Sequence, residues 1–192
     1  MPRSKEKVRK RLQEAALELY RKRGFDQTTT AEIAANAGVT ERTFFRHFPD
    51  KREVLFDGEA VLKPALVQAV AAAPPKLGAW ETLFWAFRSV EQLFVENRPF
   101  SEPRQKVIAS CPALQERELA KVGSLTATLA AALRQRGIAD RVATLAAQTG
   151  MATLSHALTS WLDDDSGDLH HYLVQAFREM QALSASSSKL VR

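Results

Sequence analysis

Residues 28–56 read TTTAEIAANAGVTERTFFRHFPDKREVLF, and this stretch decides how the N-terminal part of the chain folds. Thr29 followed by Glu32 is a capping box, in which each side chain binds the other residue's backbone amide at a helix start. Gly38 supplies a tight turn, because glycine adopts positive φ without strain. Thr40 can then cap a second short helix. The pattern predicts two short helices joined by a turn of three or four residues, which is a helix-turn-helix.

The second short helix has two different faces. Phe44 and Phe48 lie one turn apart and are expected to be buried. The other face carries Glu41, Arg42, Thr43, Phe45 and Arg46. Such a helix fits the major groove of DNA, about 12 Å wide, and meets bases with its N-terminal residues. A bare helix–glycine–helix pattern would also suit an ordinary helical hairpin, but the complete pattern here extends over the whole of residues 28–56.

The positive charge of the chain is concentrated in the same region. Residues 1–56 hold 13 Lys and Arg against 8 Asp and Glu, whereas residues 57–192 hold 14 of each. The whole net charge of +5 therefore lies in the first 56 residues. This asymmetry favours a polyanionic partner for the front of the molecule, although charge alone would also suit a basic disordered tail.

The rest of the chain shows helical periodicity and almost no strand signals. We therefore predict an all-α protein of about nine helices. A three-helix DNA-binding domain is expected in residues 1–50, and a helical bundle for ligand binding and dimerisation in residues 51–192. The helix expected at 51–73 connects them and ends before Pro74 and Pro75. The other long helices are expected at about 4–23, 79–97, 103–110, 112–136, 140–162 and 168–183.

Residues 4–56 closely resemble the N-terminal domain of the tetracycline-repressor (TetR) family of bacterial regulators. The resemblance rests on ALELYRKRGFDQTTTAEIAANAGV (residues 16–39) and TERTFFRHFPDKREVLF (residues 40–56). It implies a homodimer that binds double-stranded DNA at a palindromic operator and represses transcription until a small molecule releases it. An activator role in the same family stays open.

The same resemblance implies which residues meet DNA. Thr40, Arg42, Thr43, Phe45 and Arg46 fall at positions of the recognition helix that face DNA, and Thr29 and Lys51 fall where the family contacts phosphates. Two positions depart from the family pattern. Phe45 stands where tyrosine is usual, so the phosphate contact of a tyrosine hydroxyl is lost, and Arg42 stands where a small residue is common. His47 is expected to pack against a neighbouring helix.

The larger region offers an apolar stripe for a ligand pocket. The expected pocket residues, centred on the helix at 79–97, are Trp80, Phe84, Phe87, Arg88, Glu91, Phe94 and His156. Such a pocket would take an apolar or aromatic effector. The alternative is that these aromatic side chains simply fill the core.

A row of small residues in the helix at 140–162 permits close helix packing. Its members are Ala143, Ala147, Gly150, Thr153, Ala157 and Ser160. With the apolar face of the last helix they could form the dimer interface, or they could pack inside one chain. The sequence leaves these two possibilities open.

Other classes of function have little support in the sequence. No catalytic triad, phosphate loop or metal triad stands out, so neither an enzyme nor a cofactor or metal is expected. No apolar run approaches the roughly 18 residues that span a bilayer, and the basic N-terminus does not continue as a signal peptide. The lone Cys111 fits a reducing cytoplasm and is expected to be a small buried residue rather than a redox sensor. The rival hypotheses are a metabolite-binding protein without regulatory DNA binding and a non-specific DNA-binding protein.

Overall fold

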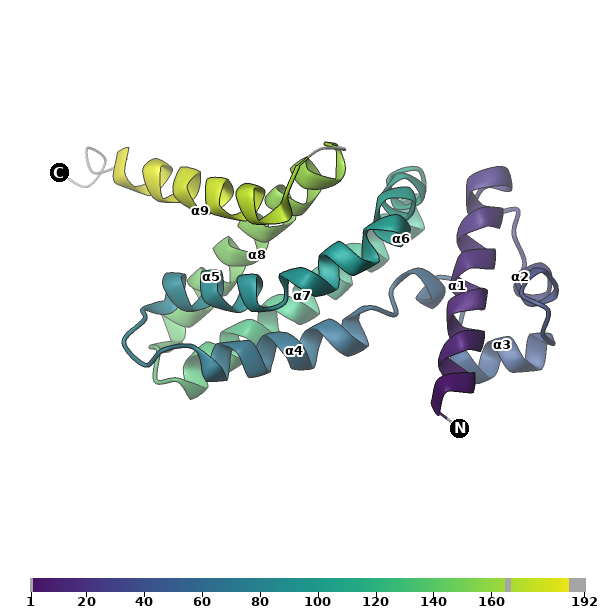
Figure 1. Ribbon diagram of the computed structural model, residues 1–192, viewed down its shortest axis with the longest axis horizontal. Coiled ribbons are helices and arrows are strands. Elements are labelled where there is room, and N and C mark those ends of the chain that lie inside the picture. Colours follow the sequence, from purple (N-terminus) through teal and green to yellow (C-terminus); the bar gives the residue numbers. More distant parts are fainter. Residues whose placement is uncertain (1, 165–166, 187–192) are drawn as a thin grey trace. The chain divides into compact units, whose positions relative to one another are not determined.

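The computed structural model describes residues 2–164 and 167–186, and every regular element in that part is a helix (Figure 1). In chain order these are α1 (Pro2–Arg23), α2 (Thr30–Asn36), α3 (Glu41–His47), the 3₁₀ turn η1 (Glu53–Leu55), α4 (Glu59–Ala72), α5 (Ala79–Ser89), α6 (Glu91–Ala109), α7 (Pro112–Gln135), α8 (Asp140–Leu162) and α9 (Leu169–Ser186). The predicted all-α fold of about nine helices is confirmed within these residues.

The helix expected at residues 51–73 begins later than predicted. The carboxylate of Asp50 accepts the backbone amides of Arg52 at 2.7 Å and Glu53 at 3.2 Å, which starts the short η1 turn. The chain then turns at Asp57 and Gly58, and α4 begins only at Glu59. Asp and Gly favour turns over helix interiors, so the connection is a 3₁₀ turn followed by a helix.

The helix expected at residues 79–97 is interrupted before it reaches Pro99, and a second helix then continues through that proline. α5 ends at the buried Val90, and α6 contains both Pro99 and Pro103, so the separate helix expected at 103–110 is the end of α6. Proline removes a backbone donor, but its fixed φ near −65° is compatible with a helix. The break at Val90 is therefore set by packing rather than by the strongest local helix breaker.

The chain divides into two compact units. Unit 1 combines Met1–Glu59 with Pro99–Lys121, and unit 2 combines Ala60–Arg98 with Val122–Arg192. Helices α6 and α7 each contribute residues to both units. The N-terminal helices therefore form one compact unit with residues 99–121, a segment that begins 40 residues after Glu59 in the sequence.

The core of unit 1 contains side chains from the first three helices and from the segment 99–121. Leu12, Ile33, Phe44 and Phe48 are almost completely buried, as the sequence predicts for the two phenylalanines. The segment 99–121 adds Val107, Ile108, Cys111 and Leu114 to the same cluster. Cys111 is buried here, as expected.

Unit 2 is built around α5, α8 and α9. The small residues Ala143, Ala147, Gly150, Thr153 and Ala157 are buried inside the unit. A Cβ on Gly150 would lie 2.7 Å from Cδ1 of Leu83, so this glycine lets α5 approach α8 closely. Of the two possibilities that the sequence left open for this row, packing inside one chain therefore holds for these five residues.

Within unit 2, Arg136 forms hydrogen bonds to the carbonyls at the end of α4. Its guanidinium donates to the carbonyls of Val70 at 3.0 Å, Ala73 at 2.9 Å and Pro74 at 2.9 Å. The last carbonyls of a helix lack partners inside the helix, so an arginine here satisfies groups that would otherwise need water.

None of the helices in the described residues combines the length and the apolar character needed to cross a membrane. The same residues contain no group of three or more His, Cys, Asp or Glu side chains arranged to hold a metal ion.

Candidate nucleic-acid interface

The turn between α2 and α3 sets the angle between the two short helices. Gly38 has φ of +66°, and its amide donates to the carbonyl of Ala35 at 3.0 Å. The next amide, that of Val39, donates to the carbonyl of Ala34 at 2.9 Å. The predicted glycine turn is confirmed, and α2 and α3 pack against each other with α1 beside α2 (Figure 1).

The start of α2 carries the predicted capping box. The hydroxyl of Thr29 accepts the amide of Glu32 at 3.2 Å, and the amide of Thr29 donates to the Glu32 carboxylate at 2.9 Å. Arg23 donates to the other carboxylate oxygen at 2.9 Å. These hydrogen bonds, with Thr29 first, lower the pKa of Glu32 below its ordinary value. Thr29 remains exposed, so the fixed start of α2 is accessible to a partner.

Helix α3 separates an apolar inner face from a polar outer face. Thr40 caps the helix by accepting the amide of Thr43 at 3.2 Å. Phe44 is fully buried, whereas the ring of Phe45 is 52% exposed. Arg42 and Arg46 are exposed and, with Phe45, follow the spacing of one helix face. The structure thus brings the predicted recognition residues together on one outer surface, with Thr43 half-buried at its edge.

A carboxylate also belongs to this surface. Glu41, the first residue of α3, is exposed and accepts a hydrogen bond from the hydroxyl of Thr30 in α2. The bond ties the first residues of the two helices together. The sequence places Glu41 on the outer face but gives no sign of this bond, because the two residues lie eleven positions apart.

His47 is half-buried, and its ring centre lies 6.5 Å from that of Phe48, the next residue in the chain. Its Nε2 is buried and has no hydrogen-bond partner among the described residues. Burial, together with the nearby cations Arg46, Arg9 and Lys5, lowers the pKa of His47.

Lys51 is placed differently from the other predicted DNA contacts. Its ammonium donates to the carbonyls of Phe25 and Thr28, each at 2.9 Å, and lies 4.3 Å from the centre of the Phe25 ring. The side chain is half-buried rather than extended from the surface.

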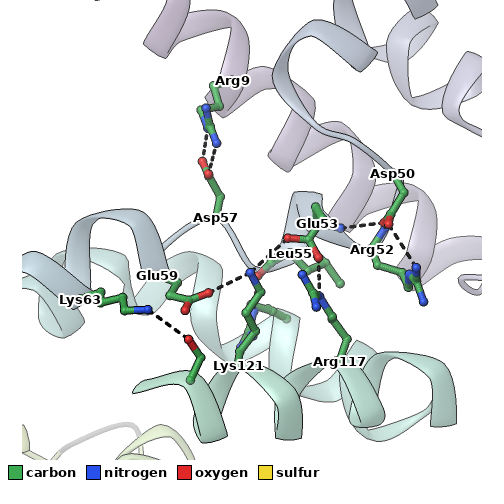
Figure 2. Close-up of polar contacts among 12 residues, drawn as sticks. Arg9, Asp50, Arg52, Glu53, Leu55, Asp57, Glu59, Lys63, Arg117 and Lys121 are labelled. Atoms are coloured by element: carbon green, nitrogen blue, oxygen red, sulfur yellow. Dashed lines mark hydrogen bonds and ion pairs between the residues drawn. The ribbon is translucent and has the colours of Figure 1, made fainter. Parts of the chain in front are cut away.

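A charged network supports the segment behind α3 (Figure 2). Glu53 accepts from Arg117 and, at 3.1 Å, from Lys121, which also reaches Glu59 at 2.8 Å. Arg104 donates to the carbonyl of Leu55 at 2.6 Å. Burial alone would raise the pKa of Glu53, but the hydrogen bonds and charges of Arg117 and Lys121 outweigh it, so the pKa is lowered. The sequence does not reveal this network, because its partners are more than 45 positions apart.

The residues predicted to line a ligand pocket do not all lie together in unit 2. Trp80, Phe84 and Phe87 surround Phe177 of α9, with ring centres 4.4, 5.0 and 6.0 Å from it. Phe94 packs half-buried against the core of this unit. By contrast, Arg88 and His156 are exposed.

Two polar groups near these aromatics have no hydrogen-bond partner among the described residues. They are Nε1 of Trp80 and the hydroxyl of the fully buried Thr82. Glu91 lies 3.5 Å from Nδ1 of His170. The sequence does not identify Phe177 as a neighbour of the aromatic stripe, since α5 and α9 are about 90 residues apart.

The chain was compared with known protein families and proteins. Residues 12–57 match the family described as bacterial regulatory proteins, tetR family, and residues 77–185 match the MftR C-terminal domain. The HTH-type transcriptional regulator TcmR of Streptomyces glaucescens is 34% identical over 84 residues, which are 44% of this chain and 37% of TcmR. The chain thus aligns with little more than a third of this relative.

Solved structures resemble the chain over most of its length. The transcriptional repressor FadR of Thermus thermophilus, in complex with lauroyl-CoA, is 26% identical with a TM-score of 0.54, and 88% of this chain and 91% of FadR are covered. SmeT of Stenotrophomonas maltophilia, in complex with triclosan, is 19% identical with a TM-score of 0.63, over 92% of this chain and 90% of SmeT. At that identity SmeT supports the fold alone. Because the two family matches together extend from residue 12 to residue 185 and agree with the helix-turn-helix geometry, this chain belongs to the tetR family of bacterial regulatory proteins.

Proposed function

We propose that the chain is a transcriptional repressor that binds a palindromic DNA operator as a homodimer and is released by a small molecule. The outer face of α3 enters the major groove. The residues of this face that meet bases and the adjoining DNA backbone are Thr40, Arg42, Thr43, Phe45 and Arg46. Thr29 and Lys51 belong to the part of the surface that faces the DNA phosphates.

One observation carries the proposal: α3 is anchored by one face and exposed on the other. Phe44 is fully buried and Phe48 is 1% exposed, so the helix is held by its own unit, whereas Phe45 is 52% exposed. An exposed ring between two exposed arginines is costly to leave in water, and it suits contact with a thymine methyl group or a sugar. Arginine can bind the O6 and N7 atoms of guanine at the same time.

Selection of bound sequences from a random duplex pool tests this function. We expect a palindromic consensus whose half-sites lie about one helical turn apart, because each protomer contributes one recognition helix. Equal affinity for selected and random duplexes would instead favour a non-specific DNA-binding protein. Absence of any duplex binding would favour a metabolite-binding protein.

We propose that the dimer forms through the outer face of α8. Val142 and Leu145 are 52% and 65% exposed, and Ala152 and His156 are exposed on the same face. Their spacing of three, seven and four residues keeps them on one side of the helix, as in a helix–helix seam. Five of the six small residues that could have served this purpose are buried inside unit 2, so the row is not part of the proposed interface.

We propose an effector with a substantial apolar part. The support is the aromatic cluster around Phe177 and the lauroyl-CoA bound to the FadR of Thermus thermophilus, which is 26% identical to this chain. Lauroyl-CoA is therefore the first compound to titrate into a protein–operator complex, with coenzyme A as the matched control. Release of the operator by the former and not by the latter supports an acyl chain as the recognised part. Equal release by both would contradict it.

A further inference from the structure

We infer that Lys51 is a positioning residue for the phosphate-side surface, acting through the Thr28–Thr29 backbone rather than by touching DNA itself. The inference rests on the proposed DNA-binding function. It assigns Lys51 a role that differs from the direct phosphate contact implied by the family resemblance.

The surroundings of the Lys51 ammonium carry the inference. Two of its three N–H donors are used by the carbonyls of Phe25 and Thr28, each at 2.9 Å. The charge also lies 4.3 Å from the centre of the Phe25 ring, which is a favourable cation–π position. Moving the ammonium to a phosphate would leave two carbonyls without this donor.

The backbone of Lys51 is held as firmly as its side chain. The hydroxyl of Tyr20 donates to the Lys51 carbonyl at 2.6 Å. Tyr20 is 3% exposed, and burial raises the pKa of its hydroxyl, so the donor proton is retained at any physiological pH. Its ring also meets Phe25 edge to face at 5.3 Å. Lys51 therefore lies in a closed set of contacts between the end of α1 and the loop before α2.

This lock lies directly before the start of α2. The carbonyl of Thr28 immediately precedes Thr29, whose hydroxyl and amide form the capping box of α2. Thr29 is exposed, and the proposed function assigns it to the side of the surface that meets phosphates. By fixing the Thr28 carbonyl, Lys51 fixes the direction in which Thr29 and the first amides of α2 are presented.

A comparison of salt dependence separates the two roles of Lys51. Loss of a direct phosphate contact lowers the slope of log K against log salt concentration by about 0.9, because one condensed counterion fewer is released. Loss of a positioning contact weakens binding without that change in slope. We therefore propose to measure Lys51→Met on the selected operator and on a random duplex, with Arg46→Met as the control for a directly contacting cation.

The expected result for Lys51→Met is about a tenfold loss of affinity on both duplexes with an unchanged slope. Arg46→Met should lower the slope by about 0.9. In a Thr29→Ala background the Lys51→Met change should lose most of its effect, because both act on the same contact. Additive effects, a slope lowered by about 0.9, or unchanged affinity in Lys51→Met would each overturn the inference.

Hydrogen exchange of the full-length protein without DNA gives a second readout. Lys51→Met should speed amide exchange in residues 25–32 more than in α8, because the loop loses its tie to the following segment. Unchanged exchange there would overturn the lock. If the wild-type protein binds no duplex at all, the proposed function fails, but this measurement still reports on the lock.

Discussion

If α3 enters the major groove as proposed, single side chains on this helix should decide which DNA sequence the protein prefers. Arg42, Phe45 and Arg46 are exposed with the spacing of one face, and Thr40 and Thr43 lie at the start of the helix with hydroxyls 3.1 Å apart. Arg42 occupies a position where the family often has a small residue, and Phe45 replaces the usual tyrosine. The base preference of this chain should therefore depend strongly on residues 42 and 45.

Arg42→Ala should relax the preference at one base pair of each half-site. The expected cost for the preferred duplex is about 1–3 kcal/mol, because a two-point contact with one base is lost. Competition binding with operators altered at single positions measures it. Arg178→Ala, which removes an exposed arginine of α9, is the matched control and should leave the base preference unchanged. An unaltered preference in Arg42→Ala would contradict placement of this residue at a base.

At the scale of elements, the helix-turn-helix is held by short-range geometry and by a network that reaches it from α6 and α7. The turn needs the positive φ of Gly38, and the capping box needs only Thr29 and Glu32. The segment after α3 is instead held by Arg104 of α6 and by Arg117 and Lys121 of α7. Figure 2 shows the contacts of the two α7 side chains.

Gly38→Ala should destabilise the protein by about 1–2 kcal/mol, because an L-residue is strained at φ of +66°. Gly58→Ala provides the control, since a Cβ there meets no atom within 4 Å and the residue does not have positive φ. Urea unfolding of both variants measures the difference. Equal stability of the two variants would show that the turn relaxes without cost.

The network around Glu53 should make stability depend on acid pH. The folded-state pKa of Glu53 is lowered below the ordinary value of 4.5, so its contribution is fully present above that value and is lost as the pH falls through the lowered pKa. Glu53→Gln should destabilise the protein by about 1–3 kcal/mol at neutral pH and flatten the acid limb of the stability profile.

Thermal unfolding between neutral and acid pH measures this effect. The control is Glu116→Gln, which changes an exposed carboxylate on α7, the helix that carries Arg117 and Lys121, and should alter stability by no more than about 0.5 kcal/mol. If both variants lost stability at acid pH just as the wild-type protein does, Glu53 would not be the group that causes this pH dependence.

At the scale of the whole molecule, α6 and α7 belong to both compact units. Residues 112–121 of α7 lie in unit 1 and residues 122–135 in unit 2, in one continuous helix. An effector bound in unit 2 would therefore share two helices with the unit that carries α3. Binding of effector and operator should then be reciprocally coupled, so that each weakens the other by the same factor.

Leu145→Glu should separate the proposed dimer. Leu145 is 65% exposed, so the change should leave the protomer folded, whereas two carboxylates brought together in a helix–helix seam are strongly unfavourable. We expect the dimer dissociation constant to rise at least about 30-fold in sedimentation experiments, with a matching loss of palindromic operator binding. Leu119→Glu, at a 73% exposed position on α7, controls for the added charge. A dimer that persists in Leu145→Glu would place the interface elsewhere.

The sequence by itself determined the helix-turn-helix, because its signals act within a few residues. Capping by Thr29 and Thr40, the turn at Gly38 and the burial of Phe44 and Phe48 each depend on local spacing, and all are found in the structure. The long helices α7 and α8 also begin and end close to the bounds that helical periodicity predicts.

Only the tertiary structure determines which side chains of distant segments contact each other. Lys51 binds carbonyls 23 and 26 positions away, Glu53 pairs with α7, and the aromatic stripe of α5 closes around Phe177. The small residues of α8 face the inside of unit 2, and α6 passes through two prolines while the real break falls at Val90. Helical periodicity shows that a face is apolar or small but does not specify its partner, because the free energy of burial is nearly the same against any apolar surface.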